Sequence, residues 1–202
     1  MESRQIILAG IGMGSKELIT AEVRKLIEEA DCLIGAERML ACAIKLRNSE
    51  EKCTRECTKY QEYRTEKIIS YLQKHKEYKQ IVILLSGDTG FYSGAKNLRN
   101  QLLEKLSLVE EKKIKILPGI SSLSYLASKA GVSWEDAKIL SLHGKDMNFV
   151  QTIHRHSKTF LLLGGKETGR HFYETLLEYG RFMWDVRCLM RKKRFFQVNC
   201  VR

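Results

Sequence analysis

The stretch that decides the fold is IVILLSGDTGFY, residues 81–92. Its first five residues form an uninterrupted apolar run of strand length, which is typical of a parallel strand covered on both faces. A small, polar turn, SGDTG at 86–90, follows at once, and the apolar spacing over 95–106 predicts a helix after it. A buried strand, a glycine turn and a helix form the repeating unit of α/β proteins.

The same order of strand, turn and helix recurs on both sides of this stretch. Strands alternating with helices in this way predict an α/β fold with mostly parallel strands. The polar stretch 104–113 places a boundary near residue 112, which gives an N-terminal α/β domain at 1–112 and a C-terminal α/β domain at 113–202. Further strands are expected at 5–10, 32–35, 114–117, 138–142 and 159–163, and further helices after the N-cap Thr20, over 61–76, over 121–130 and over 167–179.

Composition excludes several classes of protein. With 202 residues, 44% of them hydrophobic and 29% charged, the chain is long and apolar enough to fold without disulfide bonds or a structural metal ion. No apolar run approaches the ~18 residues of a membrane span, and the start MESRQII lacks the apolar segment of a secretory signal. Six cysteines are too few for a disulfide scaffold. We therefore expect a cytoplasmic protein with reduced thiols, no membrane partner and no metal site.

The net charge of +11 is concentrated at the end of the chain. From Arg181 onward, seven basic residues and one acidic residue contribute +6 of it. The remaining chain is mildly basic, with acids and bases mixed, as in KLIEEA and EEKKIK. A basic protein suits an anionic partner, either a nucleic acid or a small molecule with several carboxylates.

Four small, polar turns follow predicted strands. They are GIGMGS at 10–15, SGDTGFY at 86–92, PGISS at 118–122 and SLHGK at 141–145. The carboxyl ends of parallel strands meet at one edge of a sheet, which is where open α/β sheets bind ligands. Each turn taken alone is also explained as a tight connection or a helix cap. Together they predict one ligand site.

Two side chains in these turns are candidates for chemistry. Asp88 could accept a hydrogen bond from a hydroxyl or an ammonium group, or it could cap the helix that follows. His143 could move a proton, although a single histidine is more often structural. The sequence contains neither the G-x-S-x-G motif of a serine nucleophile nor an H-E-x-x-H metal motif.

These motifs, in this order and spacing, resemble the tetrapyrrole (corrin/porphyrin) methylases. The stretch from Pro118 through WEDA to SLHG is similar to one member family, the precorrin-6Y C5,15-methyltransferases, in their C5-methylating subunit. The resemblance covers about residues 5–180. It implies two α/β domains with S-adenosylmethionine bound in the cleft between them. It also implies a set of cofactor-binding residues, namely Met13, Ser86, Gly87, Asp88, Phe91, Ser121, Ser122 and Leu163.

The resemblance further implies methylation of C5 of cobalt-precorrin-7 or a related precorrin, in cobalamin biosynthesis. Asp88 and His143 are then the candidates for assisting proton loss, and Arg38, Lys129 and Lys145 for pairing with the carboxylates of the corrin. Expected partners are the corrin substrate, a separate decarboxylating C15-methylase and a second copy of the chain, with no nucleic acid. The alternatives are a porphyrin, diphthine or ribosomal RNA methylase of the same superfamily, or a basic nucleic-acid-binding protein.

The tail at 181–202 departs from the family pattern. It contains no proline and no paired acids, where the family continues with a glycine turn and further strands. One hypothesis is a shifted reading frame at this point. The other is a divergent final strand.

Overall fold

The computed structural model describes residues 4–49, 56–106, 113–141, 149–163, 170–175, 177–178 and 194–199, the last of these as backbone only. The chain divides into two compact units, Met1–Ser122 and Leu123–Arg202. Each unit is described by itself.

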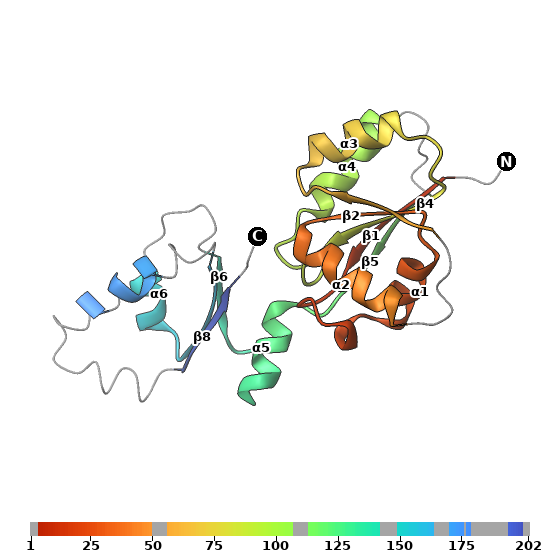
Figure 1. Cartoon of the computed structure of the whole chain (residues 1–202). Coiled ribbons are helices and arrows are strands. Elements are labelled where there is room, and N and C mark those ends of the chain that lie inside the picture. The colour runs from red at the N-terminus through yellow and green to blue at the C-terminus, as the bar shows by residue number, and fades with distance from the viewer. Residues whose placement is uncertain are drawn as a thin grey trace. The chain divides into compact units, whose positions relative to one another are not determined.

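The first unit is built on a five-stranded sheet in the order β3-β2-β4-β1-β5 (Figure 1). All four strand pairs are parallel, so every connection must cross over the sheet. The predicted α/β class with parallel strands is therefore confirmed. The strands are β1 (Gln5–Gly10), β2 (Cys32–Gly35), β3 (Thr58–Gln61), β4 (Gln80–Leu85) and β5 (Ile114–Leu117).

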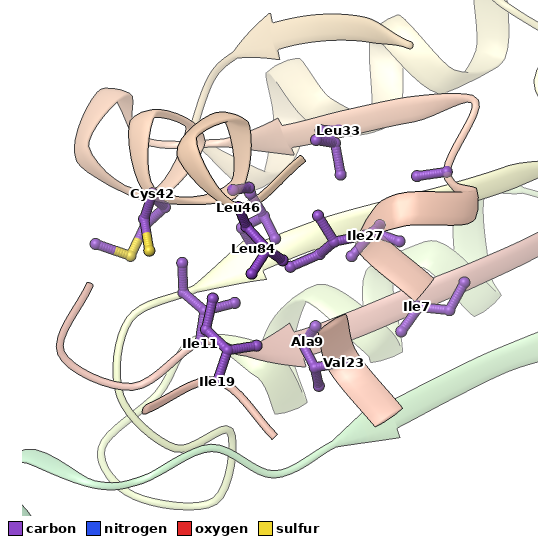
Figure 2. Close-up of a cluster of buried hydrophobic side chains, with 14 of the residues drawn as sticks. Ile7, Ala9, Ile11, Ile19, Val23, Ile27, Leu33, Cys42, Leu46 and Leu84 are labelled. Carbon is purple, nitrogen blue, oxygen red and sulfur yellow. The ribbon is translucent and has the colours of Figure 1, made fainter. Parts of the chain in front are cut away.

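Helices cover both faces of this sheet, α1 and α2 on one and α3 and α4 on the other (Figure 1). Side chains alternate along a strand, so Ile7 and Val82 point to one face while Ile6 and Ile81 point to the other. Figure 2 shows the first of these cores, where Ile7 lies among Val23 and Ile27 of α1. The helical segments are η1 (Lys16–Leu18), α1 (Ala21–Glu29), α2 (Glu37–Asn48), α3 (Thr65–Lys74) and α4 (Ala95–Lys105).

Several predicted boundaries differ from the observed ones. The helix expected over 61–76 begins only at Thr65, because Gln61 ends the edge strand β3. The strand β3, the helix α2, the short helix η1 and, in the second unit, the helix at Phe149–Arg155 were not predicted. The strand Ile114–Leu117, which the boundary near residue 112 assigns to the second domain, pairs with β1 in the first sheet. The assignment of 1–112 and 113–202 as functional domains stays a prediction.

The second unit contains a parallel sheet in the order β6-β7-β8. Its core gathers Leu140, Phe149, Ile153, Leu161, Leu163 and Phe172. The last strand lies in the atypical tail, which agrees with a divergent final strand, while the shifted reading frame stays a hypothesis. The elements are α5 (Ser122–Ala130), whose first residue still belongs to the first unit, β6 (Lys138–Ser141), α6 (Phe149–Arg155), β7 (Lys158–Leu163) and β8 (Arg194–Asn199).

The described part of the chain contains neither a membrane-spanning helix nor a metal-binding cluster. None of the helices in these ranges is long and apolar enough to cross a membrane. The same ranges bring together no group of three or more histidine, cysteine, aspartate or glutamate side chains able to hold a metal ion.

Candidate functional site

Three glycines bring three loops into backbone contact at the carboxyl edge of the first sheet. Gly10 ends β1, Gly87 follows β4 and Gly119 follows β5. A Cβ atom on Gly10 would lie 2.7 Å from the Gly119 nitrogen and 2.7 Å from the Gly87 oxygen. No real side chain fits at such distances from backbone atoms. The three glycines therefore allow the loops to pack without side chains between them.

The first two loops are also joined by backbone hydrogen bonds. The Gly12 amide donates to the Gly87 carbonyl (3.1 Å), and the Gly87 amide donates to the Gly12 carbonyl (2.8 Å). Both residues have a positive φ, +65° and +69°, which glycine adopts without strain. This isolated antiparallel bridge lies beyond the parallel pairing of β1 and β4 and fixes the loop of Met13 against that of Ser86.

Asp88 holds the second loop to the third. One carboxylate oxygen accepts the Gly90 amide at 2.8 Å, within its own loop, and the other accepts the Gly119 amide at 3.0 Å. The Thr89 hydroxyl donates to the Leu117 carbonyl at 3.2 Å and adds a second tie to the end of β5. Charge-assisted bonds to backbone amides are among the stronger hydrogen bonds in proteins. Asp88 thus does not cap α4 but joins two loops.

Arg38, the second residue of α2, connects the first two loops from the side of β2. Its guanidinium donates to the Met13 carbonyl at 2.9 Å and to the Ser86 hydroxyl at 3.0 Å. The side chain is exposed. Arg38 was expected to pair with substrate carboxylates, but its role in joining loops was not predicted.

The aromatic residues after Asp88 extend the same loop outward. The Phe91 ring is half-buried and meets the Tyr92 ring edge-on, with 5.0 Å between centroids. Tyr92 is 62% exposed and, in the part of the chain that the structure describes, is the single non-glycine residue with a positive φ, +47°. A bulky residue is costly in this conformation, and such strain is concentrated at functional sites.

Most of the predicted site residues lie at this one edge. Met13, Ser86, Gly87, Asp88 and Phe91 belong to the first two loops. The residues predicted at the start of α5 are in the same unit: a Cβ on Gly87 would lie 3.9 Å from the Ser122 nitrogen, and the Ser122 side chain is buried. With Ser121 and Ser122, the structure therefore brings seven of the predicted residues to this edge.

The other predicted residues lie elsewhere. Leu163 ends β7, is fully buried and packs in the core of the second unit. Lys129 is on α5, with its ammonium 5.6 Å from the centre of the Tyr125 ring. His143 and Lys145 fall outside the described residues. The cofactor role of Leu163 and the catalytic role of His143 stay predictions.

Cysteine nucleophiles are absent from this edge as far as the described residues go. The three described cysteines, Cys32, Cys42 and Cys57, are free thiols. Burial raises the pKa of all three, that of Cys32 to about 12. They therefore stay protonated at neutral pH and have little nucleophilic character.

The arrangement suits a small ligand with both polar and anionic groups. Glycine loops let a ligand approach the backbone closely, and Arg38 and Ser86 add a positive charge and a hydroxyl at the same place. Among the described residues, this edge contains no cluster of metal ligands and no nucleophile paired with a base.

Comparison with known sequences gives matches over most of the chain. Residues 5–186 match the family model of the Tetrapyrrole (Corrin/Porphyrin) Methylases. The chain is 34% identical to the probable cobalt-precorrin-7 C(5)-methyltransferase of Methanocaldococcus jannaschii, over 78% of this chain and 70% of that protein. It is 24% identical to the cobalt-precorrin-7 C(5)-methyltransferase of Salmonella typhimurium, over 87% of this chain and 79% of that protein.

Solved structures share the fold. The methyltransferase CobJ superposes with a TM-score of 0.57 at 24% identity, covering 76% of this chain and 62% of that one. The uroporphyrin III C-methyl transferase of Thermus thermophilus gives a TM-score of 0.56 at 21% identity, over 94% of this chain and 77% of that one. At these identities the likeness shows the fold alone.

Proposed function

This chain belongs to the tetrapyrrole (corrin/porphyrin) methylases, and from that premise we propose that it is an S-adenosylmethionine-dependent C-methyltransferase of cobalamin biosynthesis. We assign the reaction to C5 of cobalt-precorrin-7 or a related precorrin. The observation that carries this assignment is the 34% identity with a relative whose name states that reaction.

The glycine edge supports the choice of cofactor. S-adenosylmethionine combines a carboxylate, an ammonium group, ribose hydroxyls and an adenine ring. We propose that the loops of Met13 and of Ser86 to Phe91, with Ser121 and Ser122, hold it. The three loops meet backbone to backbone, and their polar groups match the polar groups of the cofactor.

The chemistry asks little of the protein beyond position. When bound, S-adenosylmethionine supplies a methyl group that its positively charged sulfur has already activated. The protein must hold the acceptor carbon in line with that methyl group and exclude water. Such alignment lowers a barrier by about 7–11 kcal/mol in well-oriented reactions. Fixed loops serve this purpose, and the ties made by Asp88 and Arg38 fix them.

Asp88 is assigned a positioning role in this scheme. Its two oxygens accept the amides of Gly90 and Gly119, and these bonds direct the carboxylate at its own loops. His143 remains the candidate for assisting proton loss from the ring. We further propose a corrin substrate, cooperation with a separate decarboxylating C15-methylase, and a homodimer.

A specific match supports one other ring position as a second candidate. The chain is 32% identical to the cobalt-precorrin-4 C(11)-methyltransferase of Methanocaldococcus jannaschii, over 60% of this chain. The two reactions share a cofactor and differ in substrate. The position of the transferred methyl group therefore decides between them.

The test is a product analysis. The purified chain is incubated with cobalt-precorrin-7 and S-adenosylmethionine carrying a ¹³C-labelled methyl group, and the product is examined by mass spectrometry and carbon NMR. We expect one added methyl group, bonded to C5. Label at C11, or turnover with cobalt-precorrin-4 alone, would replace the C5 assignment by the C11 reaction. A folded protein that turns over neither substrate would contradict both.

A further inference from the structure

Arg38, in the first turn of α2, contacts two of the loops of the carboxyl edge. It follows β2, its guanidinium donates to the Met13 carbonyl after β1, and it donates to the Ser86 hydroxyl after β4. We propose that Arg38 is the carboxylate receptor of this site. This inference rests on the proposed function and adds to it the residue that recognises an anionic group.

The guanidinium keeps hydrogen-bonding capacity for a ligand. Arginine has five N–H donors, and two of them are used on Met13 and Ser86. Within the described residues, no carboxylate forms an ion pair with Arg38. Its charge therefore faces solvent with three N–H groups available. An anion can take these without displacing a protein partner.

The guanidinium is also held in place before any ligand arrives. An exposed arginine normally loses side-chain entropy when it binds, and this cost weakens surface ion pairs. Here the two bonds to Met13 and Ser86 have already fixed the planar group. A fixed planar fork matches the geometry of a carboxylate.

Two neighbouring residues support this assignment. Gly14 leaves room beside the guanidinium, since a Cβ atom there would lie 3.2 Å from an Arg38 terminal nitrogen. Asp88, the acid of the adjacent loop, directs its two oxygens at the Gly90 and Gly119 amides. The one acid in residues 10–15, 86–92 and 118–122 is thus bonded to backbone amides, and the positive charge of Arg38 is left for a ligand.

The carboxylate can come from two sources under the proposed function. One is the amino-acid end of S-adenosylmethionine, and the other is an acetate or propionate side chain of the corrin. Both present the same group to the guanidinium. The experiment below distinguishes them.

Isothermal titration calorimetry with two probes examines the first source. S-adenosylhomocysteine carries the amino-acid carboxylate, and 5′-methylthioadenosine lacks it. Arg38→Gln removes the charge but keeps hydrogen-bond donors. If Arg38 binds the cofactor, the variant should bind S-adenosylhomocysteine about 10- to 100-fold more weakly, the usual range for a lost charged hydrogen bond. The affinity of Arg38→Gln for 5′-methylthioadenosine should stay within about twofold of the wild-type value. The affinity of Arg38→Lys for S-adenosylhomocysteine should lie between those of the wild type and Arg38→Gln.

Steady-state kinetics examine the second source. If Arg38 binds the corrin, Arg38→Gln should leave S-adenosylhomocysteine affinity unchanged and raise KM for the tetrapyrrole about 10-fold or more. Arg24→Gln is the matched control, because Arg24 is on α1 and its side chain also donates to a backbone carbonyl, that of Lys16, at 3.0 Å. The control should match the wild type in both assays, and thermal melts should show all variants folded.

Three results would overturn the proposal. Equal weakening of S-adenosylhomocysteine and 5′-methylthioadenosine would mean that Arg38 only holds the loops. Wild-type values for Arg38→Gln in both assays would mean that it has no role. A wild-type chain that binds neither nucleoside and turns over no corrin would instead refute the proposed function on which the inference rests.

Discussion

The first sheet has an amino edge, where its strands begin, and a carboxyl edge, where they end, and close glycine packing distinguishes the second from the first. At the amino edge, side chains tie the loops: Asp31 accepts the amides of Lys79 and Gln80, at 3.0 and 2.8 Å. Arg4 donates to the carbonyls of Leu72 and His75, at 3.0 and 2.8 Å. At the carboxyl edge, Asp88 and Arg38 also tie loops, but there the glycine backbones in addition pack directly on one another.

This difference indicates that the amino edge contributes to folding stability, whereas the carboxyl edge also contributes to ligand binding. The amino edge uses its charged groups on its own backbone, and the Tyr71, His75 and Tyr78 rings stack over the same end of the sheet. The carboxyl edge keeps Arg38, Ser86 and Tyr92 exposed beside loops that glycine makes thin. Changes at the amino edge should therefore reduce stability alone, while changes at the carboxyl edge should also reduce ligand binding.

The largest effect is expected for Gly119→Ala. The new Cβ would lie 2.5 Å from the Gly10 oxygen and 2.6 Å from the Gly10 carbonyl carbon, so the backbone of two loops must move. Overpacking of this kind costs about 1–3 kcal/mol of unfolding free energy. We also expect at least about tenfold weaker binding of S-adenosylhomocysteine, because a lost or displaced contact of ~1.4 kcal/mol corresponds to that factor.

Gly94→Ala is the control for that substitution. Gly94 precedes α4 with a φ of −73°, and nothing lies within 4 Å of its Cβ position. Urea unfolding and calorimetry should give values close to the wild type. If Gly94→Ala lost as much unfolding free energy and ligand affinity as Gly119→Ala, the packing of the three loops would have no special importance.

A somewhat smaller effect is expected for Asp88→Asn, and it separates two roles. If Asp88 joins the loops, the amide loses the charge-assisted bond to the Gly119 nitrogen and binding of S-adenosylhomocysteine weakens about tenfold. If Asp88 instead moves a proton, kcat should fall by about 10²–10⁴ with the binding constant preserved. The structure favours the first outcome, and comparing calorimetry with single-turnover rates decides between them.

Asp31→Ala tests the opposite edge. It removes the acceptor of two amides and should lower the free energy of unfolding by about 1–2 kcal/mol, since both bonds involve a charged group near the surface. Binding of S-adenosylhomocysteine to the folded variant should not change. Weaker binding would mean that the two edges are coupled, contrary to the comparison drawn above.

The smallest effect concerns pH and Glu62, which follows β3. Its carboxylate accepts the Tyr63 and Arg64 amides and pairs with the Arg64 guanidinium at 2.7 Å. The Arg64 side chain, more than any other group, lowers the pKa of Glu62 to about 2. A depressed pKa in the folded state stabilises the protein above the ordinary value of about 4.3, and this stabilisation is lost as pH falls towards 2.

The variant for this test is Glu62→Gln. Its deficit in unfolding free energy relative to the wild type should be full at pH 7 and should shrink between about pH 4 and pH 2, the window between the ordinary and the depressed pKa. Urea unfolding at several pH values measures it. A deficit that is constant across that range would show that the charge of Glu62 makes no contribution.

Sequence reasoning succeeded where burial leaves a simple pattern. Strands β1 and β4 are continuous apolar runs because helices cover both of their faces. Thr20 was expected to cap the next helix, and its hydroxyl accepts the Val23 amide at 3.4 Å. It missed β3, TKYQ, because an exposed edge strand needs no apolar residues. It also missed α2, although Met39, Ala43 and Leu46 lie on one buried face.

The candidate site was predictable as a set of turns but not as an assembly. The turns after β1, β4 and β5 were identified, yet their contacts depend on the strand order β3-β2-β4-β1-β5, which local patterns do not contain. Arg38 reaches Met13 and Ser86 because β2 lies next to β4 and β4 next to β1. A pairing between residues 38 and 86 has no signature in the spacing of the chain.

Hydrogen–deuterium exchange with and without S-adenosylhomocysteine tests the central claim most directly. The ligand should protect backbone amides at the carboxyl edge, in residues 10–15, 86–92 and 118–122. Amides of the amino edge, in residues 29–31 and 75–80, should exchange at the same rate in both samples. Protection confined to the amino edge, or no protection anywhere at saturating ligand, would contradict the assignment of the glycine loops as the binding site.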